Sequence, residues 1–356
     1  MGDDGPSSLL VEGQWPSLGY EATNNRSRPS GGVPANSVRP QWRTRVSRAV
    51  SSCPTLGQQK AFVTSVRDGV VAVERATGET VWERNDLTTV SSTPALSGDR
   101  LYFGTVDGVV ALQRDEGTVV WRRELGVSHA ASPTVLDGTV YIGSGQSVYA
   151  LDSESGTVEW SFTTGGQIGT APAVDDEAVY VTSADDSIYS VARSDGSENW
   201  ATAVDDGISC SPVLRAETVV TAGLDGVLYG MSRQNGAIRR TAEVGPVFAG
   251  IANRDNQILV SSRTGLHSVQ PRAGGYEHDW RFAPGSLGFR SAPAVVGETV
   301  YAGHENGSVY AVNLTDGSER WRYDTETAAV RSAPAVAGGG VYVGDDDGFV
   351  YALSAV

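Results

Sequence analysis

The stretch Ser132–Trp160 reads SPTVLDGTVYIGSGQSVYALDSESGTVEW, and its short apolar runs alternate with turns. The clearest runs are Val140–Gly143 and Val148–Leu151, and a turn that contains Gly156 precedes the tryptophan. Short apolar runs bounded by glycine and polar residues are typical of β-strands. The stretch and its flanks therefore predict four short antiparallel strands.

The same pattern returns along nearly the whole chain. Each unit begins with small residues and a proline, and seven units carry this mark: Pro54, Pro94, Pro133, Pro172, Pro212, Pro293 and Pro334. Successive prolines lie 40, 39, 39, 40, 81 and 41 residues apart. The interval of 81 residues holds two units, and Ala252 stands where the second proline is expected. A fixed period indicates a repeat protein, here with eight units.

A second mark has the same period, because in five units a glycine is followed four residues later by a tryptophan. The unit that begins at Pro212 has Arg240 instead, and the next unit reaches Trp280 from Gly274 through two extra residues. Glycine permits the positive φ of a tight turn, and tryptophan offers a flat face to a neighbouring unit. We expect a structural role for these tryptophans: Trp42, Trp82, Trp121, Trp160, Trp200, Trp280 and Trp321.

Four strands in about 40 residues make one blade of a β-propeller. The last unit ends after three strands, at Ala352 and Leu353, whereas Gln41–Thr44 supplies an unassigned strand at the other end of the chain. The sequence therefore predicts an all-β, eight-bladed propeller over residues 39–356, whose last blade the N-terminal strand completes. Residues 1–38 are predicted to form an N-terminal extension.

The composition limits the functions that the chain can have. With 42 Asp and Glu against 27 Lys and Arg, its formal charge is -15, which argues against nucleic-acid binding. Lys60 is the one lysine among these 27 cations. An acidic surface almost without lysine predicts a halophilic protein. The alternative is a genome of high GC content, which favours Arg over Lys and would explain the shortage of lysine but not the acidity. No long apolar segment and no basic, apolar leader is seen in the sequence, so we expect a soluble protein, and a monomer.

The repeat Val148–Asp152, VYALD, followed by Gly156 and Trp160, resembles the pyrroloquinoline-quinone (PQQ) type of propeller repeat. Quinoprotein alcohol dehydrogenases and a bacterial outer-membrane assembly lipoprotein share this repeat. The resemblance extends from Gln41 to Val356, and the entry segment Gln14–Asn24 resembles the lead-in of haloarchaeal members. Such members are often exported or lipid-anchored. The resemblance thus favours the cell envelope or the exterior, whereas a chain complete as written would be cytoplasmic.

The quinoprotein enzymes use an adjacent pair of cysteines against the cofactor, a calcium ion held by Glu, Asn and Asp, and an Asp base. This chain has only Cys53 and Cys210, and its short units leave little chain for a lid. Its four histidines have no metal-ligand spacing, and acid runs such as Asp345–Asp347 occupy positions of turns. PQQ is therefore an open but disfavoured cofactor, and neither a metal site nor a catalytic residue is predicted.

The innermost strands predict a candidate site, because alternate residues of these strands face the central channel. Four residues before each proline position the chain has Val50, Val90, His129, Ile168, Ile208, Phe248, Phe289 and Val330, which predict a packed face. Three residues before it the chain has Ser51, Ser91, Ala130, Gly169, Ser209, Ala249, Arg290 and Arg331, which we expect in the channel. The paired arginines predict an anion site, lined also by Ser51, Ser91 and Ser209, unless the protein's own acids neutralise them.

Three functional classes follow from these observations. The favoured one is a non-enzymatic scaffold that binds a protein, peptide or carbohydrate through the channel mouth or the rim loops. The alternatives are a reduced PQQ-dependent oxidoreductase, whose cofactor carboxylates would engage Arg290 and Arg331, and a sensor domain of an envelope or signalling system. The sequence leaves enzymatic activity open, and it does not identify the ligand.

The acidic composition generates a first prediction. A charge of -15 repels itself until salt screens it, so the melting temperature should rise from low to molar KCl. Thermal scans by circular dichroism would measure this. Melting temperatures that stay flat or fall with added salt would remove the halophile interpretation.

Overall fold

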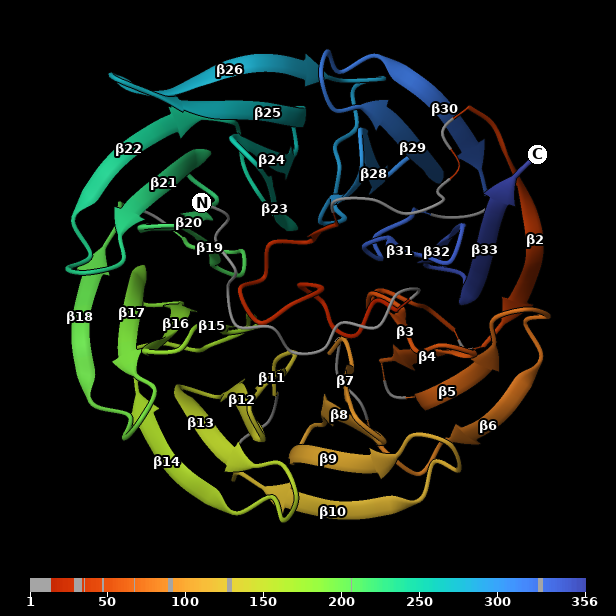
Figure 1. Ribbon diagram of the computed structural model, residues 1–356, viewed down its shortest axis with the longest axis horizontal. Coiled ribbons are helices and arrows are strands. Elements are labelled where there is room, and N and C mark those ends of the chain that lie inside the picture. Colours follow the sequence, from red (N-terminus) through yellow and green to blue (C-terminus); the bar gives the residue numbers. More distant parts are fainter. Residues whose placement is uncertain are drawn as a thin grey trace.

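The computed structural model describes residues 14–28, 34, 36–46, 48–66, 68–88, 92–126, 130–205, 207–325 and 329–356. These residues form eight antiparallel sheets that stand around a central channel (Figure 1), and one further strand joins one of the sheets in parallel. Each sheet is a blade whose strands run in order from the channel to the outer wall. The prediction of an all-β, eight-bladed propeller is confirmed. Among the described residues, no helix could span a membrane.

The first four blades follow the chain without interruption. Blade 1 comprises β3 (Thr55–Leu56), β4 (Lys60–Ser65), β5 (Gly69–Glu74) and β6 (Thr80–Arg84). Blade 2 comprises β7 (Ala95–Ser97), β8 (Arg100–Gly104), β9 (Gly108–Gln113) and β10 (Val119–Glu124). Blade 3 comprises β11 (Thr134–Leu136), β12 (Thr139–Ser144), β13 (Ser147–Asp152) and β14 (Val158–Thr163). Blade 4 comprises β15 (Ala173–Val174), β16 (Ala178–Ser183), β17 (Ser187–Ala192) and β18 (Glu198–Ala203).

The other four blades include two strands from the N-terminal part of the chain. Blade 5 comprises β19 (Val213–Arg215), β20 (Thr218–Ala222), β21 (Val227–Ser232) and β22 (Ile238–Glu243). Blade 6 comprises β23 (Gly250–Arg254), β24 (Gln257–Ser262), β25 (Gly265–Arg272) and β26 (Gly275–Phe282). Blade 7 comprises β27 (Ala294–Val296), β28 (Thr299–Gly303), β29 (Ser308–Asn313) and β30 (Glu319–Asp324), with β1 (Ser27–Arg28) alongside. Blade 8 comprises β31 (Ala335–Ala337), β32 (Gly340–Gly344), β33 (Phe349–Ala355) and the N-terminal strand β2 (Val38–Arg45).

The ring closes as the sequence predicts, because β2 pairs antiparallel with β33 as the outer strand of the last blade. Without β2, blade 8 would lack its outer strand and β33 would expose an unpaired edge. Trp42 on β2 donates from Nε1 to the Arg75 carbonyl of blade 1 at 2.8 Å. The last blade, which is built from both ends of the chain, is therefore bonded to the first blade, and the ring is closed.

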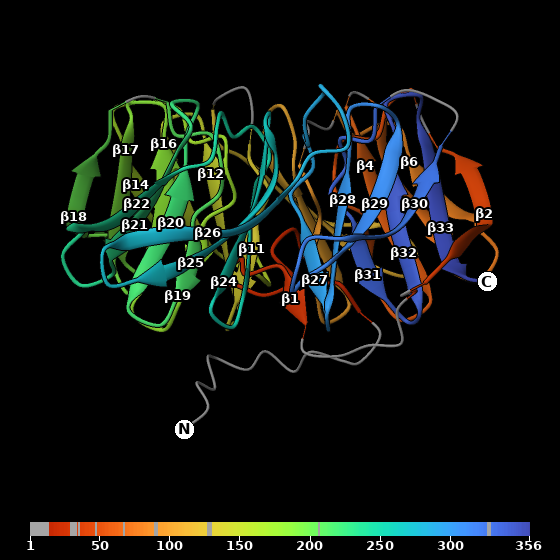
Figure 2. The ribbon, with the colours of Figure 1, turned by 90° about the horizontal axis from the view of Figure 1, so that it is seen from above.

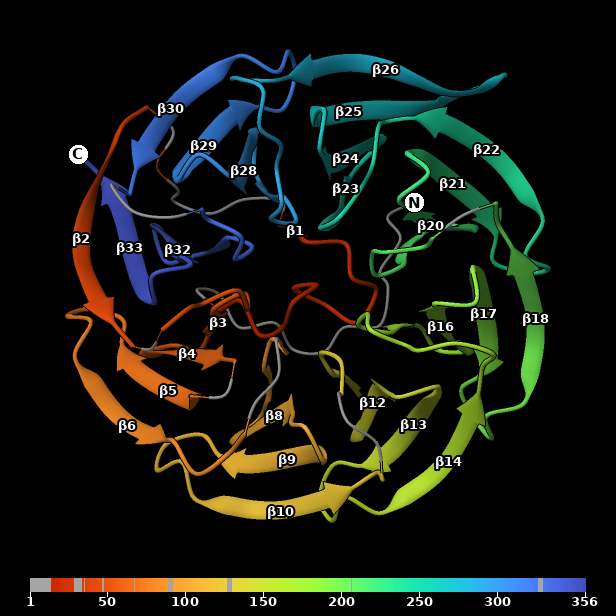
Figure 3. The ribbon, with the colours of Figure 1, turned by 180° about the vertical axis from the view of Figure 1, so that it is seen from behind.

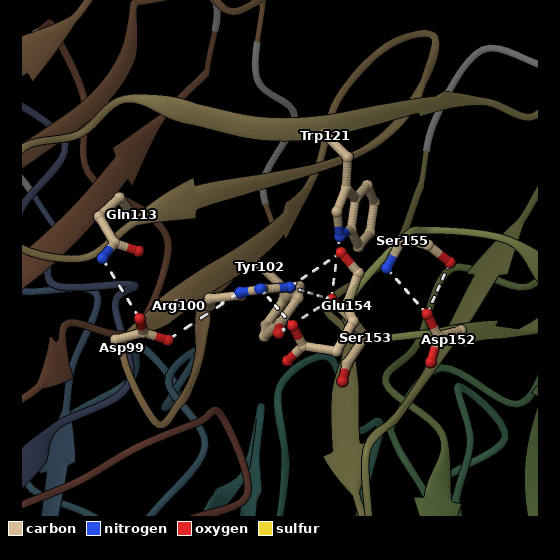
Figure 4. A network of polar contacts seen from close by, with 9 residues as sticks. All are labelled: Asp99, Arg100, Tyr102, Gln113, Trp121, Asp152, Ser153, Glu154 and Ser155. Carbon is tan, nitrogen blue, oxygen red and sulfur yellow. Dashed lines mark hydrogen bonds and ion pairs between the residues drawn. The ribbon is translucent and has the colours of Figure 1, made fainter.

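The repeated tryptophans join consecutive blades. Each of the eight outer strands carries a β-bulge beside the tryptophan position, which turns the side chain towards the next blade. Trp160 lies on Gly196 of blade 4, where an added Cβ would come within 2.7 Å of the indole. In Figure 4 the equivalent Trp121 points its Nε1 at the Ser153 carbonyl, 2.9 Å away. Glycine is required at these turns both for its positive φ and for the approach of the ring.

The unit without a tryptophan replaces it with a residue from the next blade. The β25–β26 hairpin is longer than in the other units, and its Tyr276 is buried against blade 5. A Cβ at Gly230 would lie 2.1 Å from the Tyr276 hydroxyl, so this glycine admits the ring. Tyr276, on the longer hairpin, thus packs against blade 5 at the position where that blade has Arg240 and no tryptophan.

Residues 15–28 cross the channel at the end where the inner strands finish, and we call this segment the plug (Figure 3). Its backbone bonds to the inner strands of six blades in turn. The bonds run from Leu56 N to Trp15 O at 2.8 Å, Leu96 N to Pro16 O at 2.7 Å, Val174 N to Ala22 O at 2.9 Å, Leu214 N to Thr23 O at 3.0 Å, Asn253 N to Asn25 O at 2.8 Å and Val295 N to Arg26 O at 3.0 Å. Figure 2 shows β1, at the end of this segment, on the lower face of the ring. The described part of the N-terminal extension is therefore built into the propeller.

The tryptophan contact generates the second prediction. Trp160→Ala should lower the free energy of unfolding by about 3–5 kcal/mol, because it removes a buried aromatic ring between two blades. Urea denaturation would measure the loss. Val158→Ala, a more exposed change on the same strand, is the control and should cost less than about 1 kcal/mol. A loss at Trp160 as small as that of the control would contradict a structural role.

Candidate functional site

The channel holds a cavity of about 370 Å³ between its mouth and the plug. Leu18 of the plug lies at its inner end, and the remaining lining comes from the inner strands and the residues that precede them. Arg290 and Arg331 line it and keep 40% and 48% of their side chains exposed. The cavity is therefore open at the mouth and closed by the plug at the other end.

The predicted channel-facing residues lie mostly where alternation places them. Those that line the cavity are Ser51, Gly169, Ser209, Ala249, Arg290 and Arg331. Ala130 is buried in a bridge to Ser144 and does not line it. Ser91 lies outside the described residues, as do Val90 and His129 of the predicted packed face.

The predicted packed face contains one error. Val50, Ile168, Ile208, Phe289 and Val330 are buried as expected, but Phe248 is exposed and lines the cavity. The reason is a register slip of one residue. Asn253, which bonds to the plug, is equivalent to Leu214, which lies two residues after Pro212.

The residue of blade 6 that is equivalent to the proline is therefore Ile251. The prediction of Ala252 from the spacing of the prolines is wrong by one residue. Val247 takes the buried position, and Phe248 takes the channel-facing position beside Arg290. Three consecutive blades thus present large side chains to the cavity, whereas the small residues Ser51, Gly169 and Ser209 line it from three other blades.

Each of the two arginines has a carboxylate partner from the hairpin turn of its own blade. Arg290 Nε lies 2.7 Å from Glu305 Oε1, and Arg331 Nη1 lies 2.9 Å from Asp346 Oδ2. The Arg290 guanidinium also lies 4.6 Å from the centre of the Phe248 ring. Burial raises the pKa of Asp346, while Arg331 opposes that rise. The protein's own acids thus pair with both arginines, which is the alternative that the sequence left open, and an anion site has to rest on the donors that these pairs leave.

Those donors exist on both arginines. A guanidinium has five N–H donors, and its ion pair with Glu305 occupies Arg290 through Nε. The two ion pairs make their closest approach through Arg290 Nε and Arg331 Nη1, and no hydrogen bond of the described residues uses the Nη groups of Arg290 or the Nε and Nη2 groups of Arg331. Either pair of nitrogens can hold a carboxylate by two parallel hydrogen bonds. Both arginines therefore keep N–H donors that no hydrogen bond of the described residues uses.

Hydroxyl groups add further donors to the wall. Thr93 Oγ1 accepts from Cys53 N at 3.0 Å, Ser132 Oγ from Thr93 N at 2.8 Å, and Ser211 Oγ from Ala171 N at 3.0 Å. All three residues line the cavity. Because each hydroxyl oxygen accepts a backbone N–H, its own proton is the group left for a ligand. The wall is rich in donors.

A buried cation lies beneath the cavity. Arg26 of the plug donates from Nε to Pro293 O at 2.8 Å, from Nη2 to Pro334 O at 3.1 Å, and from Nη1 to the carbonyl of Leu18, the residue at the inner end of the cavity. No carboxylate of the described residues pairs with it, and burial lowers its pKa. Arg26 was not predicted as a site residue, because the plug lies outside the repeat and no periodicity marks its positions.

Metal and thiol chemistry find little support in the described residues. No group of three or more His, Cys, Asp and Glu side chains is placed there to hold a metal ion. Cys53 and Cys210 are free thiols, and burial raises the pKa of both. Asp345 acts as a turn residue, because its Oδ1 accepts from Asp347 N at 3.1 Å and from Phe349 N at 2.8 Å. The residues present do not fit the calcium and cysteine pair of the quinoprotein enzymes.

The site therefore defines a class of protein, a closed eight-bladed propeller with a blind, donor-lined cavity at one mouth. A family model described as outer membrane protein assembly factor BamB matches residues 33–111, 106–247 and 266–356. The chain thus belongs to this PQQ-repeat β-propeller family.

Solved structures are similar in fold. A quinohemoprotein alcohol dehydrogenase from Comamonas testosteroni is 14% identical, with a TM-score of 0.81 over 97% of this chain and 81% of the other. BamB from Moraxella catarrhalis is 18% identical, with a TM-score of 0.72 over 89% of this chain and 100% of the other. The computationally designed protein Ika8 is 14% identical, with a TM-score of 0.78 over 87% and 97%. A comparison with curated proteins finds no match. At these identities the likeness shows the fold alone.

A buried histidine generates the third prediction. His267 on β25 bonds through Nε2 to Thr264 Oγ1 at 2.9 Å, and its ring lies 5.4 Å from that of His278. Burial, with help from His278 and Arg281, lowers the pKa of His267 to about 4. Since the unfolded chain takes up this proton near pH 6.5, stability should fall by up to about 3 kcal/mol between pH 6.5 and pH 4.

Urea denaturation at pH 7 and pH 4.5 would measure this loss. His267→Gln should reduce it, because glutamine carries no proton to titrate, whereas His278→Gln should retain most of it. An unchanged pH dependence in His267→Gln would contradict the assignment.

Proposed function

We propose that this propeller is a non-enzymatic binding module that takes an anionic ligand or partner group into the blind cavity at the channel mouth. The observation that carries the proposal is the donor-rich wall. Arg290 and Arg331 line one cavity together with three residues that carry hydroxyl groups, and both arginines have N–H donors beyond those that lie closest to Glu305 and Asp346. Such groups bind carboxylates and other oxyanions.

The size and electrostatics of the cavity also support an anion. About 370 Å³ lies within the usual range of small-ligand sites. The buried Arg26 adds positive charge beneath the cavity floor, and a buried cation without a carboxylate is costly unless an anion comes near. The named wall residues are Arg290, Arg331, Ser51 and Ser209, with Ser91 as an expected further member outside the described residues.

A scaffold role accords better with this cavity than a redox role does. Arg290 and Arg331 could contact the carboxylates of a quinone cofactor, but the described residues contain no group of three His, Cys, Asp or Glu side chains that could hold its calcium ion. We therefore derive no redox step. A similar structure is named as the assembly factor BamB, which favours a protein partner for this chain as well, in the cell envelope or outside the cell.

The fourth prediction tests the anion site with citrate and its uncharged triamide. Isothermal titration calorimetry should show that the protein binds citrate and not the triamide. Arg290→Ser with Arg331→Ser should weaken citrate binding by about tenfold or more, because it removes both charge-assisted contacts. Arg43→Ser with Arg322→Ser, on the outer strands of blades 8 and 7, is the matched control and should bind like the parent. Equal citrate affinity in the site variant and the parent, or no citrate binding at all, would overturn the proposal.

A further inference from the structure

The blind end of the cavity limits what shape of ligand can enter. The plug crosses the channel behind Leu18 and bonds to six of the eight blades. A polymer cannot thread through a channel that is closed in this way. It can enter only by one of its ends.

The charge of the wall selects between the two ends of a peptide. An amino terminus carries a positive charge at neutral pH and would approach Arg290 and Arg331, with Arg26 beneath the floor. A carboxyl terminus carries a negative charge and two oxygens, which match the free edge of a guanidinium. The cavity therefore favours a C-terminal carboxylate.

An apolar arc leads outward from the arginine side of the mouth. It consists of Leu224, Phe248 and Leu287, which are 44%, 38% and 48% exposed. Val247 N donates to Gly223 O at 3.1 Å, so the backbone at Phe248 lies beside the backbone at Leu224. Phe248 and Gly288, the neighbour of Leu287, share a small pocket of about 90 Å³. Exposed apolar residues from consecutive units, rimmed by charged ones, mark a surface for a partner.

The same small pocket contains a further cation. Arg263, from the turn between β24 and β25, lies there with Arg290 and Glu305. Arg263 is exposed and has no ion pair among the described residues. In a chain of charge -15 this is an unneutralised cation beside an apolar surface. A partner segment with an acid among apolar residues is complementary to it.

We propose, building on the binding function above, that the open mouth captures the free carboxyl terminus of a partner protein. The terminal carboxylate occupies the cavity at Arg290 and Arg331. The apolar side chains just before it pack on the arc of Leu224, Phe248 and Leu287. An acidic side chain among them meets Arg263. This assigns a peptide C-terminus as the partner class of the cavity.

The test uses two pools of fluorescein-labelled hexapeptides whose last three residues are drawn from Asp, Glu, Leu, Ile, Phe and Ser. One pool has a free terminal carboxylate and the other a terminal amide. Fluorescence anisotropy with the full chain should show about tenfold tighter binding of the acid pool, because the amide loses the charge-assisted contact. Arg290→Ser with Arg331→Ser should abolish the difference between the pools.

The apolar arc has its own variant and control. Leu224→Ser with Leu287→Ser should weaken binding of the acid pool about tenfold and leave citrate binding unchanged. Val81→Ser with Val158→Ser changes residues that are 44% and 36% exposed, on the outer strands β6 and β14, and should alter neither the binding of the acid pool nor that of citrate. Melting temperatures would confirm that all variants fold.

The outcomes separate this inference from the proposed function. Equal binding of the acid and amide pools, with citrate binding intact, would overturn the C-terminus inference and leave the anion site standing. Loss of acid-pool binding in the outer-strand control would overturn it as well. If neither citrate nor the acid pool binds, both proposals fail.

Discussion

The contact between a tryptophan and the glycine turn of the next blade is the interaction on which this structure depends. A four-stranded blade cannot bury both of its faces alone, so each needs a neighbour on either side. The indole supplies a large apolar face, and its Nε1 is satisfied by a carbonyl of the next blade, as for Trp121 and Ser153. Trp42 makes the same contact from blade 8 to blade 1, and between blades 5 and 6, where the tryptophan is missing, Tyr276 packs against Gly230 instead. Closure then fixes the channel and everything that lines it.

Most of the fold could be predicted from the sequence because the same pattern of strands and turns recurs in eight units. The proline and the Gly–Trp pair are independent marks of the same period, and β2 was identifiable as the missing outer strand from Trp42. The error at Ala252 arose where both marks are weak: blade 6 has no proline, and the unit before it has no tryptophan. There the register is set by backbone hydrogen bonds, such as the one from Asn253 N to Asn25 O. Any residue type can make such a bond, so the register cannot be predicted from the sequence.

The site could be predicted only in part, and for the same reason. Strand alternation correctly placed Arg290 and Arg331 on the cavity wall. It could not show that Glu305 and Asp346, residues of hairpin turns, fold back onto them. The position of the plug could not be predicted, because residues 15–28 have no periodic pattern. They bind to the blades through backbone carbonyl and amide groups, which are common to all residue types. Arg26 is therefore invisible as a site residue until the chain is folded.

The asymmetry of the channel is the reason why we propose a binding surface on the side of blades 5 to 8. Eight inner strands converge on one axis, so small residues suit the channel-facing position, as Ser51, Gly169 and Ser209 do. Phe248, Arg290 and Arg331 break that pattern in three consecutive blades. Packing gains nothing from exposed arginines at a channel mouth, and the buried Arg26 adds an unneutralised charge below them. Local departures from an otherwise regular structure are typical of functional positions, and here they coincide on one side of one cavity.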